Sequence, residues 1–500
     1  MERIGIPFHF KEEHFEIVAP EFLIPTIEAT IRSVLPRAQF GTGMKLTAHY
    51  KWEDDSSLPL QVGINLSETT PWVYSDSEIL DPVYIEVDRK RRIKERIRLG
   101  VQRVLEERFA LSTGSWGILK GVRPTKLVHS LHDRGFFNDQ IEFLLQDVYA
   151  LNSEKIDLLM DVVERQRNFF NPSVNNPISV YVGIPFCPTR CSYCSFAAYP
   201  LKTHGHLFND FLQALKSEIE QLGALIKDIG LDVETIYLGG GTPTTVQGKD
   251  LSELLDLIQE NFITDNTTEF TVEAGRPETL LADTIGILKK AGVDRISINP
   301  QSMHDATLKA IGREHTVKHV YEAFSLARDA GIPIINMDII LGLPGEELIH
   351  VEKTLERVFN LKPDNLTVHS LALKRASRLK KTFEQEFIAH KQGEVMARLA
   401  REVALSAGMV PYYLYRQRHI LGDLENVGYA FPQTESVYNI QMMEERQTVL
   451  GLGGGSITKL VSPDLSLKRL VNPKCPASYS QLVKGGIKPK IDQIRKHLVV

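Results

Sequence analysis

The chain has 500 residues, of which 43% are hydrophobic and 24% are charged, so its composition excludes a disordered, a collagen-like or a membrane-embedded protein. This length is enough for about three domains of roughly 150 residues with a sizeable buried core. The formal net charge of −5 gives no overall attraction to nucleic acid or anionic lipid, so a polyanionic partner would need a local basic patch.

The first predicted region, residues 1–170, has a mixed α+β pattern. The runs HFEIVAP, MKLTAHYKW, PLQVGINLS and VYIEVDR alternate apolar and polar residues, as strands of a small sheet do. A basic helix follows, in which Ile93, Ile97 and Val101 recur at helical spacing within a run of arginines and lysines. We interpret this helix first as a solvated amphipathic surface and second as a contact for RNA phosphates. The loop GVRPTK, residues 121–126, comes next.

The second predicted region, residues 171–375, alternates strand-like and helix-like segments. Its apolar runs are ISVYVGI, ETIYLGG, TEFTVEA, VDRISIN, IPIINMDIILG and NLTVHSL. Six strands that are each followed by a helix predict an α/β fold with a parallel array, closed or nearly closed into a barrel. An open doubly wound sheet is the alternative, because periodicity alone does not determine closure.

The third predicted region, residues 376–500, begins with a long helix over 380–407. The aromatic run PYYLYRQ and the glycine-rich run TVLGLGGGSI follow. The longest apolar stretch of the chain, residues 332–345, is interrupted by Asn336 and Asp338, and residues 1–10 lack the pattern of an export signal. We therefore expect no membrane span and a cytoplasmic protein.

Three of the four cysteines lie within eight residues, in the motif Cys187-Pro-Thr-Arg-Cys191-Ser-Tyr-Cys194. This clustering excludes a disulfide framework and indicates a metal site in a reducing compartment. Three thiolates on one loop can hold three irons of a [4Fe–4S] cluster and leave the fourth iron open, which is the arrangement that binds and cleaves S-adenosylmethionine (SAM). Zinc bound by the cysteines with His204 or His206 is the alternative. Cys475 is predicted to be an ordinary buried thiol.

Further polar and glycine residues follow the later strands. The run from Gly239 to Thr244 allows a ligand to approach the backbone closely, although a tight turn needs the same glycines. Four polar residues lie at or beyond the ends of later strands: Glu273, Gln301, Arg313 and Asp338. Because barrel active sites are assembled from several strand ends, we interpret these residues as ligand contacts.

In this order, the motifs YVGIPFCPTRCSYCSF, GGGTPT, VEAGRP, RISINPQS, IGREH and MDIILGLPGE resemble the radical SAM family and, within it, the oxygen-independent coproporphyrinogen III dehydrogenase group. The segments GVRPTK and PYYLYRQ resemble the long subgroup called HemZ. The resemblance implies a partial (β/α)6 radical SAM barrel with an N-terminal α+β region and a C-terminal extension.

The resemblance also implies a role for individual residues. The three clustered cysteines, Cys187, Cys191 and Cys194, would bind the [4Fe–4S] cluster. Tyr181, Gly240, Glu273 and, less closely matched, Ile457 would contact the cluster-bound SAM. The positions around a second SAM would be Tyr193, Gly241, Thr242, Gln301, Arg313, Asp338 and Ala372.

The function that the resemblance implies is an oxidoreductase of haem biosynthesis. It would convert propionate groups of coproporphyrinogen III, or of a related tetrapyrrole, to vinyl groups. A low-potential electron donor such as flavodoxin or ferredoxin would be a partner, and nucleic acid would not. We expect Arg123 and Lys126 to pair with propionates in preference to the basic helix, because carboxylates removed from water need cationic partners.

One position departs from the dehydrogenase pattern. That group carries CxxxCxxCxC, whereas Phe196 stands at the last position here, as in the related haem chaperones. The chain contains no HNxxYW stretch, which those chaperones carry. Phe196 makes a haem chaperone one alternative function, and the missing HNxxYW stretch argues against it. An RNA-modifying radical SAM enzyme is the other alternative, because the basic N-terminal region could bind RNA.

Overall fold

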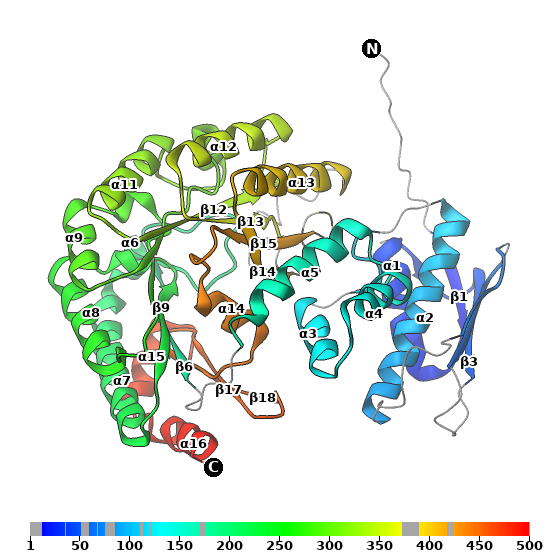
Figure 1. Cartoon of the computed structure of the whole chain (residues 1–500), viewed down its shortest axis with the longest axis horizontal. Coiled ribbons are helices and arrows are strands. Elements are labelled where there is room, and N and C mark those ends of the chain that lie inside the picture. The colour runs from blue at the N-terminus through cyan, green and yellow to red at the C-terminus, as the bar shows by residue number, and fades with distance from the viewer. Residues whose placement is uncertain are drawn as a thin grey trace. The chain divides into compact units, whose positions relative to one another are not determined.

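The computed structural model describes residues 13–35, 37–51, 60–67, 69–75, 86–110, 114–119, 123–170, 177–372, 390–417, 420, 422 and 424–499 (Figure 1). The contacts between residues divide the chain into two compact units, 1–121 with 127–159 and 122–126 with 160–500. The boundaries near residues 170 and 375 stay predictions, and residues 160–500 form a single unit by this division. Among the described residues, no helix has the length and apolar character needed to cross a membrane.

The first unit contains a five-stranded sheet with the order β2-β1-β3-β4-β5. Its strands are β1 (His14–Val18), β2 (Gln39–Phe40), β3 (Met44–Lys51), β4 (Gln61–Leu66) and β5 (Trp72–Ser75). The helices in this part of the chain are α1 (Ile24–Val34), α2 (Glu86–Phe109), α3 (Thr125–Asp133), α4 (Asn138–Phe143) and α5 (Ser153–Arg167). Phe15, Ile27, Leu46 and Ile97 belong to the core between this sheet and helices α1 and α2.

Helix α2 is the predicted basic helix, and its apolar face is buried as its spacing predicts. The prediction that its cations face water is wrong for Arg92 and Arg96, which are 7% and 1% exposed. The guanidinium of Arg96 lies 5.5 Å from the centre of the Tyr74 ring. These arginines are covered because α2 packs on α1, β4, β5 and the helical turn Leu144–Val148, and not only on one face of a sheet.

The second unit is built on an eleven-stranded sheet with the order β14-β15-β13-β12-β11-β10-β9-β6-β16-β17-β18. Its central parallel strands are β6 (Ile178–Ile184), β9 (Val233–Gly240), β10 (Glu269–Glu273), β11 (Arg295–Ser297), β12 (Ile334–Leu341) and β13 (Asn365–Ser370). Each of these strands pairs with the next one along the chain, without the reversal of order that defines a doubly wound sheet. The predicted partial (β/α)6 barrel is therefore confirmed.

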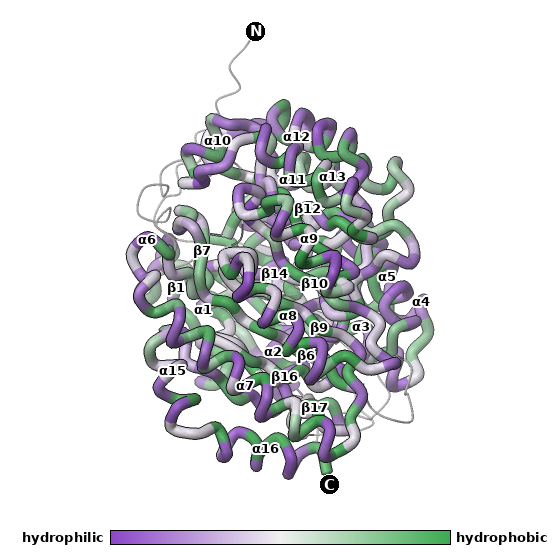
Figure 2. The backbone as a smooth tube through the Cα atoms, turned by 90° about the vertical axis from the view of Figure 1, so that its left-hand side faces the viewer, coloured by the Kyte–Doolittle hydropathy of each residue, from purple (hydrophilic) through white to green (hydrophobic). Residues whose placement is uncertain are grey.

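Helices connect these strands and lie on the outside. They are α7 (Phe208–Ile229), α8 (Gly248–Phe262), α9 (Ala282–Lys290), α10 (Asp305–Ala310), α11 (Val317–Asp329) and α12 (Leu348–Leu361). Figure 1 shows α7, α8, α9, α11 and α12 in an arc around the strands. Figure 2 shows hydrophilic and hydrophobic residues alternating along α7 and α8, as expected of helices with one face against a sheet. A short two-stranded sheet, β7 (Phe186–Cys187) and β8 (Tyr199–Pro200), and helix α6 (Leu201–His204) lie between β6 and α7.

The C-terminal segments extend both edges of the barrel sheet. On one edge, β15 (Glu425–Ala430) and β14 (Val410–Arg416) continue from β13 as antiparallel strands. On the other edge, β16 (Val449–Gly453) runs parallel to β6, and the antiparallel strands β17 (Ile457–Val461) and β18 (Leu467–Val471) follow. The remaining helices are α13 (His390–Ser406), α14 (Val437–Glu444), α15 (Pro476–Lys484) and α16 (Lys488–Leu498). The first residues of the helix predicted over 380–407, up to residue 389, lie outside the described residues.

A buried carboxylate ties the end of the chain to the barrel. Glu218 of α7 is fully buried, and it accepts hydrogen bonds from the Gly453 backbone N–H at 2.8 Å and from the Tyr479 hydroxyl at 2.5 Å. The Lys490 ammonium lies 2.8 Å from Glu218 Oε1, and the Asn472 amide donates to the same carboxylate. Because Gly453 ends β16, Glu218 also determines where that strand stops beside β6.

Candidate active site

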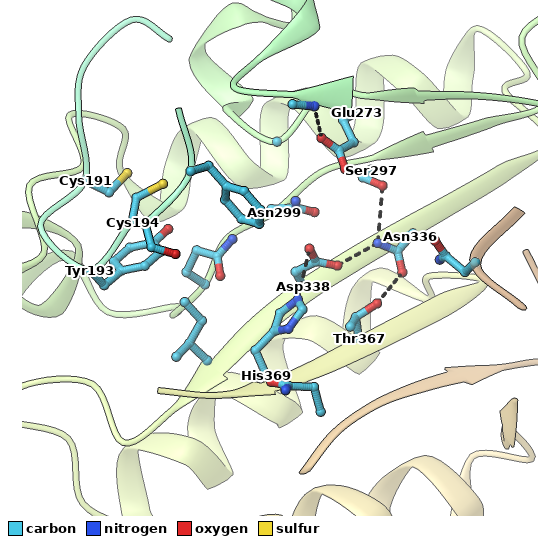
Figure 3. Close-up of a pocket in the computed structure, with 18 of the residues that line it drawn as sticks. Cys191, Tyr193, Cys194, Glu273, Ser297, Asn299, Asn336, Asp338, Thr367 and His369 are labelled. Atoms are coloured by element: carbon cyan, nitrogen blue, oxygen red, sulfur yellow. Dashed lines mark hydrogen bonds and ion pairs between the residues drawn. The ribbon is translucent and has the colours of Figure 1, made fainter. Parts of the chain in front are cut away.

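A cavity of about 370 Å³ opens at the carboxyl ends of the barrel strands. Its lining includes every residue predicted to bind the cluster or SAM except Ile457: Tyr181, Cys187, Cys191, Tyr193, Cys194, Gly240, Gly241, Thr242, Glu273, Gln301, Arg313, Asp338 and Ala372. Ile457 begins β17, and its backbone lies against Gly451 of β16. Figure 3 shows Cys191 and Cys194 on one side of this pocket and Asp338 and His369 on the other.

Cys187 ends β7, and Cys191 and Cys194 lie on the loop that follows it. Cys187 and Cys191 are 8% and 9% exposed, and burial raises the pKa of the Cys187 thiol to about 11. The Thr242 hydroxyl donates to Cys187 Sγ at 3.4 Å, and Arg276 Nη1 donates to Cys191 Sγ at 3.5 Å. Hydrogen bonds and positive charge of this kind stabilise thiolates and tune the metal that they bind.

Gly241 is necessary beside these sulfurs. A Cβ atom at this position would lie 3.0 Å from Cys187 Sγ and 2.5 Å from the Phe186 carbonyl oxygen. A side chain here would therefore collide with the backbone that carries the first cysteine. The glycine at this position is therefore required for the close approach of the chain to Cys187, and not only for a tight turn.

Cys187, Cys191 and Cys194 line one pocket, as the three thiolate ligands of a [4Fe–4S] cluster would. Among the described residues, which include all four cysteines, no three His, Cys, Asp or Glu side chains lie close enough together to hold one metal ion. A single zinc would need its sulfur ligands within about 4 Å of one another, because Zn–S bonds are ~2.3 Å long. A [4Fe–4S] cluster takes one thiolate at each of several irons and so spaces the thiolates farther apart.

Cys475 does not line the cavity. It is the residue that precedes α15, and it is partly exposed, so the prediction of a buried thiol is wrong. Backbone N–H groups at the start of α15 lower the pKa of this thiol.

Glu273 ends β10 and is held by two donors. The Tyr237 hydroxyl donates to Oε1 at 2.7 Å, and the Gly240 backbone N–H donates to Oε2 at 3.0 Å. Burial raises the pKa of Glu273 to about 7, although both hydrogen bonds act in the opposite direction. The rings of Tyr237 and Tyr438 stack with their centres 4.3 Å apart, so the carboxylate is supported by a rigid aromatic layer.

A polar network covers the opposite wall of the pocket, on strands β11, β12 and β13 (Figure 3). Asn336 Nδ2 donates to Asp338 Oδ1 at 2.7 Å and to the Ser297 hydroxyl at 3.3 Å. His369 Nε2 lies 3.4 Å from Asp338 Oδ2, and His369 Nδ1 lies 3.3 Å from the Tyr415 hydroxyl. Asp338 is therefore oriented by its neighbours before any ligand binds.

Sequence reasoning missed Tyr237, Asn336 and His369. Each lies within a predicted strand, ETIYLGG, IPIINMDIILG or NLTVHSL, and among the polar residues inside these strands only Asp338 was interpreted as a ligand contact on its position. The alternation of side chains between the two faces of a strand could have identified Asn336. It lies two residues before Asp338, so the two side chains share one face of the strand. Tyr412 and Tyr413, from the aromatic run PYYLYRQ, are buried and also line the pocket.

Of three predicted cations, one lines the pocket and two do not, and all three have partners within the protein. Arg313 lines the pocket, but its guanidinium donates to the Asn299 carbonyl at 2.7 Å and to the Gly275 carbonyl. Arg123 and Lys126 do not line the pocket, and they pair with Glu445 at 2.7 and 2.8 Å. The prediction that these two residues face propionates in this pocket is wrong, because both lie outside its lining and pair with Glu445, an acidic residue far along the chain.

A scan against family models matches residues 181–358 to the radical SAM superfamily. Over 411 residues, the chain is 40% identical to the oxygen-independent coproporphyrinogen-III oxidase-like protein HemZ of Bacillus subtilis, and the match covers 81% of this chain and 82% of the relative. This chain belongs to the radical SAM superfamily. Within it, the chain belongs with the HemZ-type coproporphyrinogen-III oxidase-like proteins.

Two further matches within the superfamily bear on function and fold. The haem chaperone HemW of Bacillus subtilis is 37% identical over 194 residues, which are 39% of this chain and 50% of that protein. The solved radical SAM enzyme HemN of Escherichia coli, a coproporphyrinogen III oxidase, matches with a TM-score of 0.53 at 23% identity, over 64% of this chain and 72% of that chain. The structural match supports the fold alone. Membership of the superfamily implies a [4Fe–4S] cluster and SAM.

Proposed function

We propose that this protein is an oxygen-independent coproporphyrinogen III dehydrogenase of haem biosynthesis, acting in the cytoplasm. One observation carries the proposal: the three clustered cysteines, Glu273 and Asp338 line the same pocket at the strand ends. In the reaction, a propionate side chain would lose a hydrogen atom to the 5′-deoxyadenosyl radical, one electron to an external electron acceptor, and CO₂, and a vinyl group would remain. Two such rounds convert coproporphyrinogen III to protoporphyrinogen IX.

In this proposal, Cys187, Cys191 and Cys194 hold the cluster, and Tyr181, Gly240 and Glu273 contact SAM. When bound, the cluster supplies the electron, obtained from a donor such as flavodoxin or ferredoxin, that splits SAM into methionine and a 5′-deoxyadenosyl radical. Glu273 is suited to bind donor groups of SAM, because Tyr237 and Gly240 fix both of its oxygens.

The opposite wall would take either a second SAM or the substrate. Tyr193, Gly241, Thr242, Gln301, Arg313, Asp338 and Ala372 are the proposed contacts of a second SAM. The tyrosines of β14 close this side of the pocket with aromatic surface, and their buried rings exclude water from the reacting groups. An apolar, aromatic wall of this kind is suited to a tetrapyrrole.

Anaerobic incubation of the reconstituted protein with coproporphyrinogen III, SAM and a reductant tests the proposal. Formation of protoporphyrinogen IX together with 5′-deoxyadenosine supports it. Cleavage of SAM without a vinyl product contradicts it.

A haem chaperone is the second candidate, and Phe196 favours it. This residue occupies the position where the dehydrogenase group has its additional cysteine, and its side chain is 68% exposed at the edge of the pocket. The same incubation distinguishes the two functions, because a chaperone would bind haem stoichiometrically and pass it on without forming a vinyl group.

A further inference from the structure

Four cations converge on a single carboxylate at a place remote from the pocket. Glu445 Oε1 lies 2.7 Å from Arg123, 3.0 Å from Lys459 and 3.2 Å from Arg469, and Oε2 lies 2.8 Å from Lys126. We call these four basic residues the cation cluster. We propose that the cation cluster binds a small multivalent oxyanion, a phosphate or a carboxylate, from solution.

The charges in the cluster do not balance. One carboxylate faces four cations, and Lys459 and Arg469 stand directly opposite each other on β17 and β18, an arrangement that like charges disfavour. Glu444, the acidic residue that precedes Glu445 in the sequence, is buried and accepts a hydrogen bond from the Thr125 hydroxyl at 2.7 Å. Burial raises the pKa of Glu444 to about 7, so this carboxyl is only partly charged at neutral pH.

Two observations indicate that the excess positive charge is uncompensated. Burial and the nearby charge of Arg123 lower the pKa of Lys459 to about 8, although Glu445 acts in the opposite direction. Within the described part of the chain, Arg123 Nε is buried and has no hydrogen-bond partner. A second anion at the accessible parts of these side chains would relieve the repulsion between the cations.

An anion in solution can reach the cluster. The side chains of Arg469, Lys126 and Arg123 are 52%, 39% and 24% exposed, whereas Glu445 and Lys459 lie beneath them at 4% and 7%. The arrangement is a buried carboxylate and ammonium covered by three accessible cations. An oxyanion could therefore bind from the solvent side without displacing Glu445.

The cluster is separate from the proposed active site. Lys459 pairs across the sheet with Val449, and Val449 stands beside Ser179 at the start of β6. The cysteine loop follows the other end of β6. The two sites therefore lie at opposite ends of the barrel strands, so this inference does not depend on the proposed function.

The test is a calorimetric titration of the purified full chain at constant ionic strength. Pyrophosphate and citrate are titrated in separate experiments. We expect one saturable site per chain, and the tighter of the two ligands identifies phosphate or carboxylate as the preferred group. Arg469→Gln should weaken binding about tenfold, because it removes an accessible charged donor. Lys468→Gln is the matched control on the same strand: it removes the same charge from an exposed neighbour that is paired with Leu460, and it should change affinity less than about twofold.

A further variant distinguishes an oxyanion-binding site from an ion-pair network that only stabilises the fold. Glu445→Gln should tighten pyrophosphate binding, because it removes the competing carboxylate and keeps the four cations. If that variant does not fold, by circular dichroism, Lys126→Gln replaces it and should weaken binding as Arg469→Gln does. Absence of saturable binding by both ligands, or equal losses in Arg469→Gln and Lys468→Gln, would overturn the proposal.

Discussion

The buried pair of Glu218 and Lys490 should contribute strongly to stability. Removing one partner of a buried ion pair leaves an uncompensated charge, which costs about 3–5 kcal/mol. Glu218 is fully buried and Lys490 is 11% exposed, and the two charged groups are 2.8 Å apart. We therefore expect Lys490→Met to lower the free energy of unfolding by about 3 kcal/mol. The remaining donors to Glu218, such as Tyr479 and Asn472, keep the cost at the lower end of that range.

A double-mutant cycle in urea measures the interaction itself. Glu218→Gln and Lys490→Met should each be destabilising, whereas the double variant should lose at least ~1 kcal/mol less than their sum, because no unpaired charge remains. The pair Arg495 and Asp228 is a matched control on the same two helices. Its charged groups are 2.6 Å apart, but its side chains are 45% and 61% exposed, so its coupling should be within about 0.5 kcal/mol of zero.

Additive effects of Glu218→Gln and Lys490→Met would refute this reasoning. They would mean that the two charges are solvated in the folded protein and that the C-terminal helix is held by apolar packing instead. A coupling in the exposed control as large as that in the buried pair would refute it as well.

Further predictions concern cofactors and pH. Iron and sulfide content should be lost in Cys191→Ala and retained in Cys475→Ala, because only the first residue lines the pocket; zinc at one equivalent after anaerobic reconstitution would contradict this. Glu273→Ala should keep the cluster but weaken SAM binding about ten- to hundredfold in a titration, the cost of a lost charged hydrogen bond of about 1.5–3 kcal/mol. Glu444 has a pKa of about 7 when folded and an ordinary value near 4.5, so its ionisation lowers stability as the pH rises through this range. The free energy of unfolding of Glu444→Gln should therefore rise relative to that of the parent as the pH increases from 5 to 8. If melting curves show the same difference between variant and parent at both pH values, the assignment is contradicted.

The strands of the barrel were predictable because their apolar runs are long and buried on both faces. The run ISVYVGI and the cysteines after it placed β6 and its loop correctly. The predicted cluster and ligand residues converge for the same reason, since parallel strands end on one side of the sheet. The family membership that these motifs suggested is confirmed by the match to HemZ.

Pairing between distant residues was not predictable. The sequence shows that Arg123 is a cation but not that it pairs with Glu445, and it shows a basic helix but not that Arg96 is covered by β5. The run TVLGLGGGSI was recognised as apolar and glycine-rich, yet its role as β16 depends on a neighbour far away in sequence. Side-chain partners within the pocket, such as His369 beside Asp338, also require the register of adjacent strands.

The parallel pairing of β16 with β6 has a consequence for the order of events during synthesis. Ser179 of β6 and Gln447, just before β16, are 268 residues apart and bonded to each other in the folded protein. At about 5–20 residues per second, the ribosome needs on the order of ten seconds to a minute to make the intervening chain. Through that interval, the strand that leads into the cysteine loop has an open edge, which is a template for pairing with other chains. Cluster insertion should therefore follow synthesis of β16, and slow or interrupted synthesis of the segment between β6 and β16 should produce aggregates that lack iron.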